Sequence, residues 1–384
     1  MIRSVVEIAV KYPKKKLQTY NFPWTKPVAG EDFYSHRLAE RLEFSVAAKL
    51  NYQRYLDWKS DDNPSKPITF KPVMGHISPV SRCNFRCTMC SVTDFKNGKR
   101  CEDMSYELFA KRLGELDELV QISLTGLSEL FLLHETLEPM LRLCRERKFW
   151  TNIATNGSLL HQRDWIKRLI EINLDEIVIS IDGVTAETFE RIRIKSNFSQ
   201  VCKNSRNLNE QFNAAGVFPK RTKMQTVLQS NNRHELFKFV PFAKELGFSC
   251  IAFETEPFDW GNIDWRQRNS KVAGELEPHE IDQLLEQGKE LGVEVGFVQI
   301  VQRYTALAKI SSLCSWPFSK IFISSDDRVV PCCHISNPDY FEIGKLGAKK
   351  SVSDVWFGED YTAFRNSHIS GNIPQQCQSC YRNK

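Results

Sequence analysis

The 384-residue chain lacks any apolar run that approaches the about 18 residues needed to span a membrane. Its first residues, M-I-R-S-V-V-E-I-A-V-K, form a short apolar stretch that Glu7 interrupts, and no small-residue cleavage site follows, so we expect no signal peptide. The chain also lacks a strong charge of either sign: 52 basic and 47 acidic residues give a net charge of +5, spread without long blocks. Such a mild, dispersed charge argues against a nucleic-acid partner. We therefore expect a cytoplasmic protein that binds neither a membrane nor a nucleic acid.

Cysteine, by contrast, is abundant, with 12 residues in the chain. In a protein without a secretion signal, this abundance indicates a reducing compartment in which the thiols bind metal rather than form disulfides. Cys83, Cys87 and Cys90 form a C-x3-C-x2-C array directly after an extended apolar run at residues 68–77. Three thiolates on one short loop can hold three irons of a [4Fe–4S] cluster and leave the fourth iron open. A structural zinc site is the alternative, but it needs four ligands, and no fourth Cys or His stands close in the sequence.

The C-x3-C-x2-C array on the loop after a first strand resembles the signature of the radical S-adenosylmethionine (SAM) superfamily. The resemblance implies that the open iron takes the amino and carboxylate groups of SAM. One electron, from a reductant such as flavodoxin or ferredoxin, then cleaves SAM to methionine and a 5′-deoxyadenosyl radical, which removes a hydrogen atom from the substrate. Met89 stands before the last Cys of the array, where the family usually has an aromatic residue near the adenine.

Strand-like and helix-like segments alternate between residues 67 and 302, which predicts an α/β fold with a parallel sheet and helices outside it. The resemblance implies the partial (β/α)6, TIM-like barrel of the family, with the site at the carboxyl ends of the strands. Residues 1–66 are interpreted as a helical segment, with a helix-like run at 30–61, that caps the barrel, pairs two subunits or docks substrate. The strand-like runs are 68–77, 120–125, 150–155, 176–181, 223–228 and 250–254, with a possible further one at 293–299.

Two of the predicted strand ends carry turns that resemble SAM-binding turns of the family. T-G-L-S-E after the second strand keeps Gly126 and Glu129, which the resemblance places near the SAM amino group, although Ser128 and Leu130 stand where Gly and Pro are common. A-T-N-G after the third strand places Asn156 either against SAM or in a plain strand-to-helix connection.

The fourth strand ends in S-I-D-G, which resembles the Ser-x-Asp-Gly strand end of the family. The resemblance assigns Ser180 to the SAM ribose or carboxylate, Asp182 to shaping the turn, and Arg193 to clamping the carboxylate with its planar fork. The alternative for Arg193 is an exposed ion pair with Glu190. Polar and aromatic residues after the sixth strand, at 254–266, are further candidates for the mouth of the barrel.

A second cysteine group follows in residues 303–384, beyond a predicted hairpin at 320–331 and together with a predicted helix at 352–365. This region resembles the auxiliary-cluster extension called SPASM in its long form and twitch in its short form. The resemblance implies one fully ligated [4Fe–4S] cluster, with Cys332 rather than Cys333 as a ligand; a four-thiolate zinc site is the alternative. The predicted ligands are Cys314, Cys332, Cys377 and Cys380.

A fully ligated second cluster suits electron transfer, so the sequence predicts an oxidoreductase that abstracts hydrogen and passes an electron to the auxiliary cluster. We expect a hydroxylated small molecule such as a sugar or cyclitol as substrate, because the cysteine count supports one auxiliary cluster and the N-terminal region lacks a clear leader-peptide-binding pattern. A peptide-modifying enzyme of ribosomal peptide maturation is the close alternative. A non-enzymatic metal-cluster scaffold is a more distant one.

Overall fold

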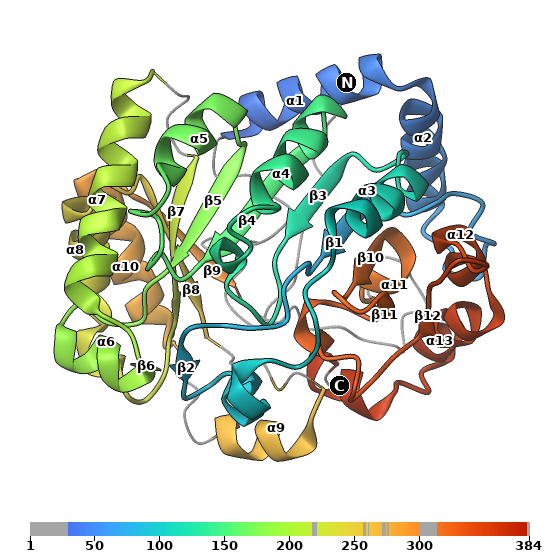
Figure 1. Cartoon of the computed structure of the whole chain (residues 1–384). Coiled ribbons are helices and arrows are strands. Elements are labelled where there is room, and N and C mark those ends of the chain that lie inside the picture. Colours follow the sequence, from blue (N-terminus) through green and yellow to red (C-terminus); the bar gives the residue numbers. More distant parts are fainter. Residues whose placement is uncertain are drawn as a thin grey trace.

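The strands of the chain assemble into a continuous sheet whose central part is parallel. The computed structural model describes residues 30–216, 221–255, 259, 261–270, 274, 276–298 and 313–381. Within these residues the main sheet has ten strands in the order β12-β11-β10-β1-β3-β4-β5-β7-β8-β9 (Figure 1). The barrel strands are β1 (Met74–Ile77), β3 (Gln121–Leu124), β4 (Trp150–Thr155), β5 (Glu176–Ser180), β7 (Thr222–Val227), β8 (Cys250–Glu254) and β9 (Glu294–Val298).

Helices connect these parallel strands and cover one face of the sheet (Figure 1). They are α3 (Tyr106–Glu115), α4 (Leu137–Glu146), α5 (Trp165–Ile172), α6 (Ala186–Ile192), α7 (Phe198–Ala214), α8 (Phe239–Glu245) and α10 (Pro278–Leu291). The predicted α/β fold, a mostly parallel sheet of the partial-barrel type with a C-terminal extension, is confirmed. No helix in the described part of the chain has the length and hydropathy of a membrane span.

The two faces of the sheet differ in polarity, as the alternation along each strand requires. Ile77, Leu124, Ile153 and Ile177 lie side by side in the strand register and belong to the core that the helices cover. The adjoining row on the opposite face is polar and buried, and consists of His76, Ser123, Asn152 and Glu176. The concave face of the open barrel is therefore lined by groups that can hold a polar ligand.

The first strand is shorter than predicted, because the backbone of Lys71 binds to a helix, although Val73 already bonds to Ser319 and Val120 on either side. Asn51 accepts a hydrogen bond from the Lys71 backbone N–H (2.8 Å) and donates one to the Lys71 carbonyl (3.1 Å). Asn51 lies in α2 (Val46–Asp61), which follows α1 (Gly30–Phe44). The predicted helix-like run at 30–61 is thus two helices, separated where the Ser45 hydroxyl accepts a bond from the Ala48 N–H (3.1 Å) and starts α2.

Helix α1 lies against the amino ends of the barrel strands. Arg41 is buried and donates to the carbonyl oxygens of Leu119 (2.8 Å), Arg147 (3.0 Å) and Asp117, in the segments that lead into β3 and β4. Arg37 pairs with Asp175, the residue before β5, at 2.9 Å. These contacts agree with the capping interpretation of the N-terminal segment and leave the carboxyl ends of the strands to the candidate site.

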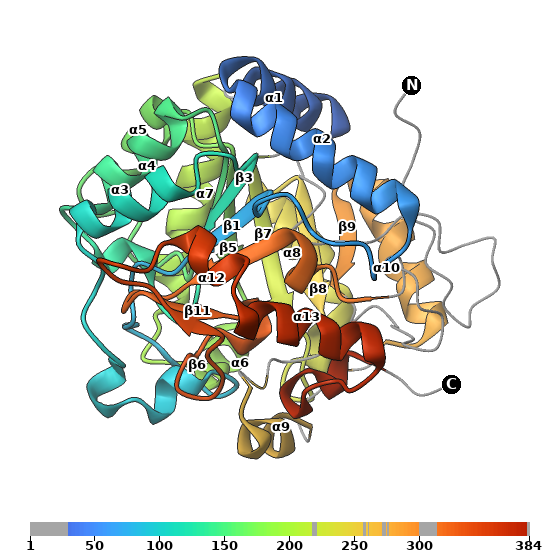
Figure 2. The same ribbon diagram turned by 90° about the vertical axis from the view of Figure 1, so that its right-hand side faces the viewer.

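The C-terminal segment extends the same sheet beyond β1. Strand β10 (Lys320–Ile323) runs parallel to β1, and β11 (Arg328–Val330) and β12 (Gly344–Lys345) continue antiparallel, so the predicted hairpin is confirmed. The predicted helix at 352–365 is instead two helices, α12 (Val352–Trp356) and α13 (Glu359–Ser370), which lie beside β11 in Figure 2. They separate at Gly358, where an added Cβ would meet the Asp354 carbonyl at 2.6 Å.

Candidate cluster and cofactor site

The first cysteine loop follows β1 and is docked onto the end of the fourth barrel unit. Strand β2 (Arg86–Cys87) pairs antiparallel with β6 (Arg193–Ile194), with Cys87 directly opposite Arg193. The Thr88 N–H also donates to the Ile192 carbonyl at 2.9 Å. This two-stranded ladder brings together Cys87 and Arg193, which the sequence placed at the site independently.

Cys87 is buried, Cys83 and Cys90 are half-buried, and the three thiols affect one another. Burial raises the pKa of Cys90 to about 12, and burial, Glu129 and the other two thiols raise the pKa of Cys83 well above its ordinary value. Two donors point at the Cys83 sulfur, namely the Phe85 N–H at 3.4 Å and the Asn156 side-chain amide at 3.9 Å. Thiols in this setting become thiolates readily when a cation compensates their burial, as iron does.

A lone zinc ion and a polynuclear cluster place different demands on the spacing of their ligands. A tetrahedral zinc with Zn–S bonds of about 2.3 Å draws its sulfurs to within about 4 Å of one another. Across the described residues, no three His, Cys, Asp or Glu side chains converge closely enough to hold one metal ion. The three thiols remain the predicted ligands of the iron–sulfur cluster, with zinc as the alternative.

Glu129 ties together the loops that follow β3 and β4. The side chain is fully buried; Oε1 accepts from Thr155 Oγ1 (2.6 Å) and the Phe131 N–H (3.2 Å), and Oε2 accepts from the Asn156 N–H (2.7 Å). Burial raises the pKa of Glu129 in spite of these donors. The Glu129 N–H donates in turn to the Arg82 carbonyl (3.0 Å), so the carboxylate sits directly beside the cysteine loop.

Asn156 fastens the turn after β4 to the cysteine loop. Its Nδ2 donates to Asn84 Oδ1 at 2.9 Å, and its Oδ1 accepts from the Ser158 N–H at 2.9 Å. Asn84 Nδ2 donates to Ser158 Oγ at 2.9 Å and closes the ring. Sequence reasoning missed Asn84 and Ser158. Asn84 lies in the C-N-F stretch of the cysteine loop and Ser158 follows the T-N-G turn, so their positions could have indicated them.

Asp182 and Arg193 form a fully buried ion pair, with Arg193 Nη2 2.7 Å from Asp182 Oδ2. The Val227 N–H donates to the other carboxylate oxygen at 2.8 Å, so Asp182 links β5 to β7 as well as to the cysteine loop. Burial works to lower the pKa of Arg193, but Asp182 and Cys87 outweigh it and raise the pKa. The alternative pairing of Arg193 with Glu190 is wrong, because Glu190 accepts the Phe198 N–H (2.8 Å) and Arg193 is not exposed.

The other predicted cofactor contacts also lie at this end of the barrel. Met89 is buried between the second and third cysteines. The backbone at Gly126 leaves no room for a side chain, because an added Cβ would stand 2.1 Å from Ser78 Oγ. Ser180 ends β5 opposite Gln225 of β7, a residue that sequence reasoning missed. Gln225 Nε2 donates to Glu254 Oε2 at 2.9 Å, so these strand ends share one polar face.

Helix α9 (Ile263–Ser270) lies next to both cysteine groups, as expected for the polar segment after the sixth barrel strand. Trp265 Nε1 and Arg268 Nη2 both donate to Asp94 Oδ2 at 2.8 Å, and the Asn269 amide donates to the Met89 carbonyl at 3.4 Å. Arg266 donates to the carbonyl of Gln376, beside Cys377, at 3.4 Å. Glu256 and Trp260, two further candidates of this segment, lie outside the described residues.

The second cysteine group gathers next to β10. Burial and the four neighbouring thiols, those of Cys314, Cys333, Cys377 and Cys380, raise the pKa of Cys332 well above its ordinary value. For Cys333, burial raises the pKa to about 12, and its strongest charged neighbours are Lys320 and Glu254. The Cys332 thiol thus lies among the predicted ligands. The Cys333 thiol adjoins Glu254 and also Cys314 and Cys380, so Cys332 as the ligand stays a prediction.

Comparison with known proteins identifies both cysteine regions. A family model described as the radical SAM superfamily matches residues 77–228, and one described as an iron–sulfur cluster-binding domain, SPASM, matches residues 314–381. The PqqA peptide cyclase of Granulibacter bethesdensis is 23% identical over 320 residues, covering 82% of this chain and 81% of that protein. The tungsten-containing aldehyde ferredoxin oxidoreductase cofactor-modifying protein of Pyrococcus furiosus is 22% identical over 323 residues, covering 76% and 82%.

Solved structures with the same fold include two with bound peptide or cofactor. Streptococcus suis SuiB bound to precursor peptide SuiA superposes with a TM-score of 0.59 at 15% identity, covering 82% of this chain and 71% of that one. The enzyme anSMEcpe with bound AdoMet superposes with a TM-score of 0.56 at 20% identity, covering 81% and 83%. The chain is therefore an enzyme rather than a metal scaffold: it belongs to the radical SAM superfamily, uses SAM with a [4Fe–4S] cluster, and carries a C-terminal SPASM iron–sulfur domain.

Proposed function

We propose that this radical SAM enzyme modifies a peptide by a net two-electron oxidation. The observation that carries the proposal is the continuous polar face between the two cysteine groups, in which Ser180, Gln225 and Glu254 lead from the SAM-site loop to Cys333. A substrate on this face lies within reach of both metal sites. The PqqA peptide cyclase and SuiB, which share both parts of the fold, support a peptide as the substrate class.

Cys83, Cys87 and Cys90 are the residues that hold the SAM-site cluster in this proposal, and Arg193 and Asn156 fix the loop that carries them. Bound SAM and cluster supply the one-electron cleavage that removes a hydrogen atom from the substrate. Asn269 and Trp265 of α9 are buried and bond to the Met89 carbonyl and to Asp94, so we expect α9 to limit the access of water to the loop.

The second half of the oxidation needs an electron acceptor and a proton acceptor. Cys314, Cys332, Cys377 and Cys380 would hold a fully ligated auxiliary cluster, which would serve as the electron acceptor. Glu254 is buried at the end of β8, and its carboxylate is held by Gln225, so it is placed to take the proton. The substrate thus loses one hydrogen atom, one electron and one proton, which balances a two-electron oxidation.

The sequence-based preference for a sugar or cyclitol alcohol is the second candidate. Its chemistry needs the same two clusters and one base, and the polar barrel face accommodates hydroxyl groups. The relatives that share both parts of the fold favour the peptide alternative instead.

Anaerobic reconstitution followed by mass spectrometry tests the proposal. Short peptides encoded beside the gene serve as one set of probes, and 2-deoxy-scyllo-inosamine serves as the small-molecule probe. We expect a peptide to lose two hydrogens in step with 5′-deoxyadenosine formation, and Cys83→Ala to abolish both. Oxidation of the cyclitol with no change in any peptide overturns the peptide proposal. Changing Cys377 and Cys380 to Ala should block turnover and spare SAM cleavage.

A further inference from the structure

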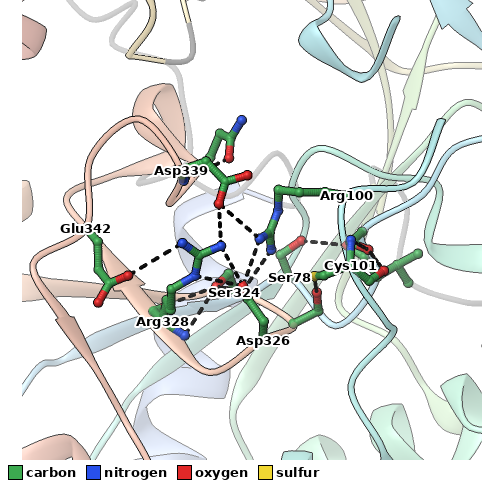
Figure 3. A network of polar contacts seen from close by, with 12 residues as sticks. Ser78, Arg100, Cys101, Ser324, Asp326, Arg328, Asp339 and Glu342 are labelled. Carbon is green, nitrogen blue, oxygen red and sulfur yellow. Dashed lines mark hydrogen bonds and ion pairs between the residues drawn. The ribbon is translucent and has the colours of Figure 1, made fainter. Parts of the chain in front are cut away.

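A chain of ionic contacts joins the two cysteine-bearing regions across the molecule. Arg100 makes a two-pronged contact with Asp326, with Nη1–Oδ2 and Nη2–Oδ1 both 2.8 Å (Figure 3). Arg328 approaches the same carboxylate from the other side, with Nε donating to Oδ2 at 2.7 Å. Arg328 also pairs with Asp339, which lies 3.8 Å from Arg100. Arg100 thus joins one network with Asp326, Arg328 and Asp339, which lie far from it in the sequence.

The Arg100 end of the network is attached to the segment that leads into the first cysteine of the SAM-site loop. The Arg100 N–H donates to the Ser81 carbonyl (3.1 Å), and the Cys101 N–H donates to Ser81 Oγ (3.0 Å), two residues before Cys83. Cys101 Sγ lies 3.2 Å from Ser325 Oγ, next to Asp326. The residues that carry Arg100 therefore move with the SAM-site loop.

The Asp326 end belongs to the auxiliary-cluster region. Asp326 stands in the turn between β10 and β11, and β11 delivers Cys332 two residues after Val330. Asp339 lies in the loop that follows Cys332 and the turn Cys333–Ile335, and its N–H is held by Asn337 at 3.1 Å. The network therefore holds the hairpin on both sides of the predicted cluster ligand.

The charged groups in this network are partly buried, so water does not readily replace their ion-pair partners. The side chain of Arg100 is 9% exposed and that of Asp326 is 26% exposed. Burial works to raise the pKa of Asp326, but Arg100, Ser324 and Arg328 outweigh it and hold the pKa well below its usual range. Asp326 is therefore ionised at neutral pH. Loss of its charge removes the nearest partner of Arg100, whose contact with Asp339 is longer at 3.8 Å, while Arg328 keeps Asp339 and Glu342.

We propose that Arg100, Asp326 and Arg328 are positioning residues that fix the auxiliary cluster relative to the SAM-site loop. The proposal rests on the proposed electron-transfer role of that cluster, because the rate of electron transfer falls steeply as donor and acceptor separate. Strand β10 already pairs with β1, and Arg112 holds Asp327 in its hairpin turn. The network adds a second tie, which joins that turn to the SAM-site loop.

Asp326→Asn is the test variant, since it keeps the shape and removes the charge. Glu102→Gln is the matched control, because the Lys99–Glu102 pair lies on the same loop but Glu102 is 89% exposed. In the metal-free protein, we expect amide hydrogen exchange of residues 321–330 to be about tenfold faster in Asp326→Asn and unchanged in Glu102→Gln. Faster exchange throughout the sheet would assign a general stabilising role and overturn the proposal, as would unchanged exchange.

The loaded protein gives a second readout that needs no substrate. Both clusters are reduced anaerobically, and the magnetic coupling between them is read from the electron paramagnetic resonance spectrum. We expect Asp326→Asn to keep its full iron content and its SAM cleavage but to show an altered coupling. Wild-type coupling in the variant overturns the proposal. Because neither readout involves a peptide, a failure of the proposed substrate class leaves both outcomes interpretable.

Discussion

Replacement of Arg193 by Ala tests the most deeply buried ion pair at the site. Asp182 has no exposed surface, and the Val227 N–H holds its second oxygen at 2.8 Å, so the carboxylate cannot turn toward water. Removing one partner of such a buried pair costs about 3–5 kcal/mol, because the remaining charge stays desolvated. A domain is stable by only about 5–15 kcal/mol, so we expect Arg193→Ala to lose a large share of the free energy of unfolding.

The pH dependence of this loss has a definite sign. In the native protein burial raises the pKa of Asp182 and Arg193 opposes that rise. Without Arg193 the folded-state pKa of Asp182 rises further above its unfolded value, so the folded variant binds the proton more tightly than the unfolded chain does. Stability then decreases as pH rises, and the loss caused by Arg193→Ala is expected to be larger at about pH 8 than at about pH 5.

Urea denaturation of the metal-free protein measures the free energy of unfolding at each pH without interference from cluster loss. The double variant Asp182→Asn with Arg193→Ala removes both charges, and we expect it to recover part of the stability that the single variant loses. A loss below about 1 kcal/mol in the single variant, or a double variant no more stable than the single one, refutes the reasoning. In the reconstituted enzyme, weakened SAM binding by Arg193→Lys at retained iron content would support the predicted carboxylate contact.

Three further predictions concern the two loops and the proposed base. Asn156→Ala removes the bond to Asn84 and should cost about 1–3 kcal/mol; iron should leave the SAM site faster under a chelator, and equal rates contradict this. Glu254→Gln keeps a partner for Gln225 but no base, so product should fall about 10²–10⁴-fold while SAM cleavage persists; unchanged turnover contradicts this. The pKa of Asp326 is depressed in the folded protein, so its ion pairs stabilise the protein above about pH 4 and are lost as pH falls further. The difference in unfolding free energy between wild type and Asp326→Asn should therefore shrink between about pH 6 and about pH 3. Urea titrations of the metal-free protein measure it.

The barrel could be predicted from the sequence because its signals are local. Each predicted strand is a short segment that contains apolar residues, and burial of Ile153 and Ile177 between sheet and helices explains why such segments become strands. Where a predicted strand boundary was wrong, a contact with a distant segment is the cause. Residues 68–73 are apolar enough for a strand, but Asn51 of α2 takes the Lys71 backbone groups that a neighbouring strand would need.

The candidate site could be predicted only in part, since its residues are arranged by contacts between distant segments. The three cysteines of the loop lie within one motif, so their grouping follows from the sequence. The ion-pair partner of Arg193 could not be predicted from the sequence, because Glu190 is nearer in the chain but Arg193 pairs with Asp182 in the folded structure. Asn84 gave no signal of its own beyond its place next to Cys83.

Strand β1 explains mechanically why the two metal regions act together. The cysteine loop is its direct continuation, and its neighbour β3 leads to the turn that holds Glu129. Its other neighbour, β10, leads through the hairpin to Cys332. A shift of β1 therefore moves both cysteine groups, whereas a bend at the hairpin turn moves only the second. The turn is where Arg100 binds, although 226 residues separate it from Asp326, so the network and the Arg112–Asp327 pair together restrain a bend at this turn.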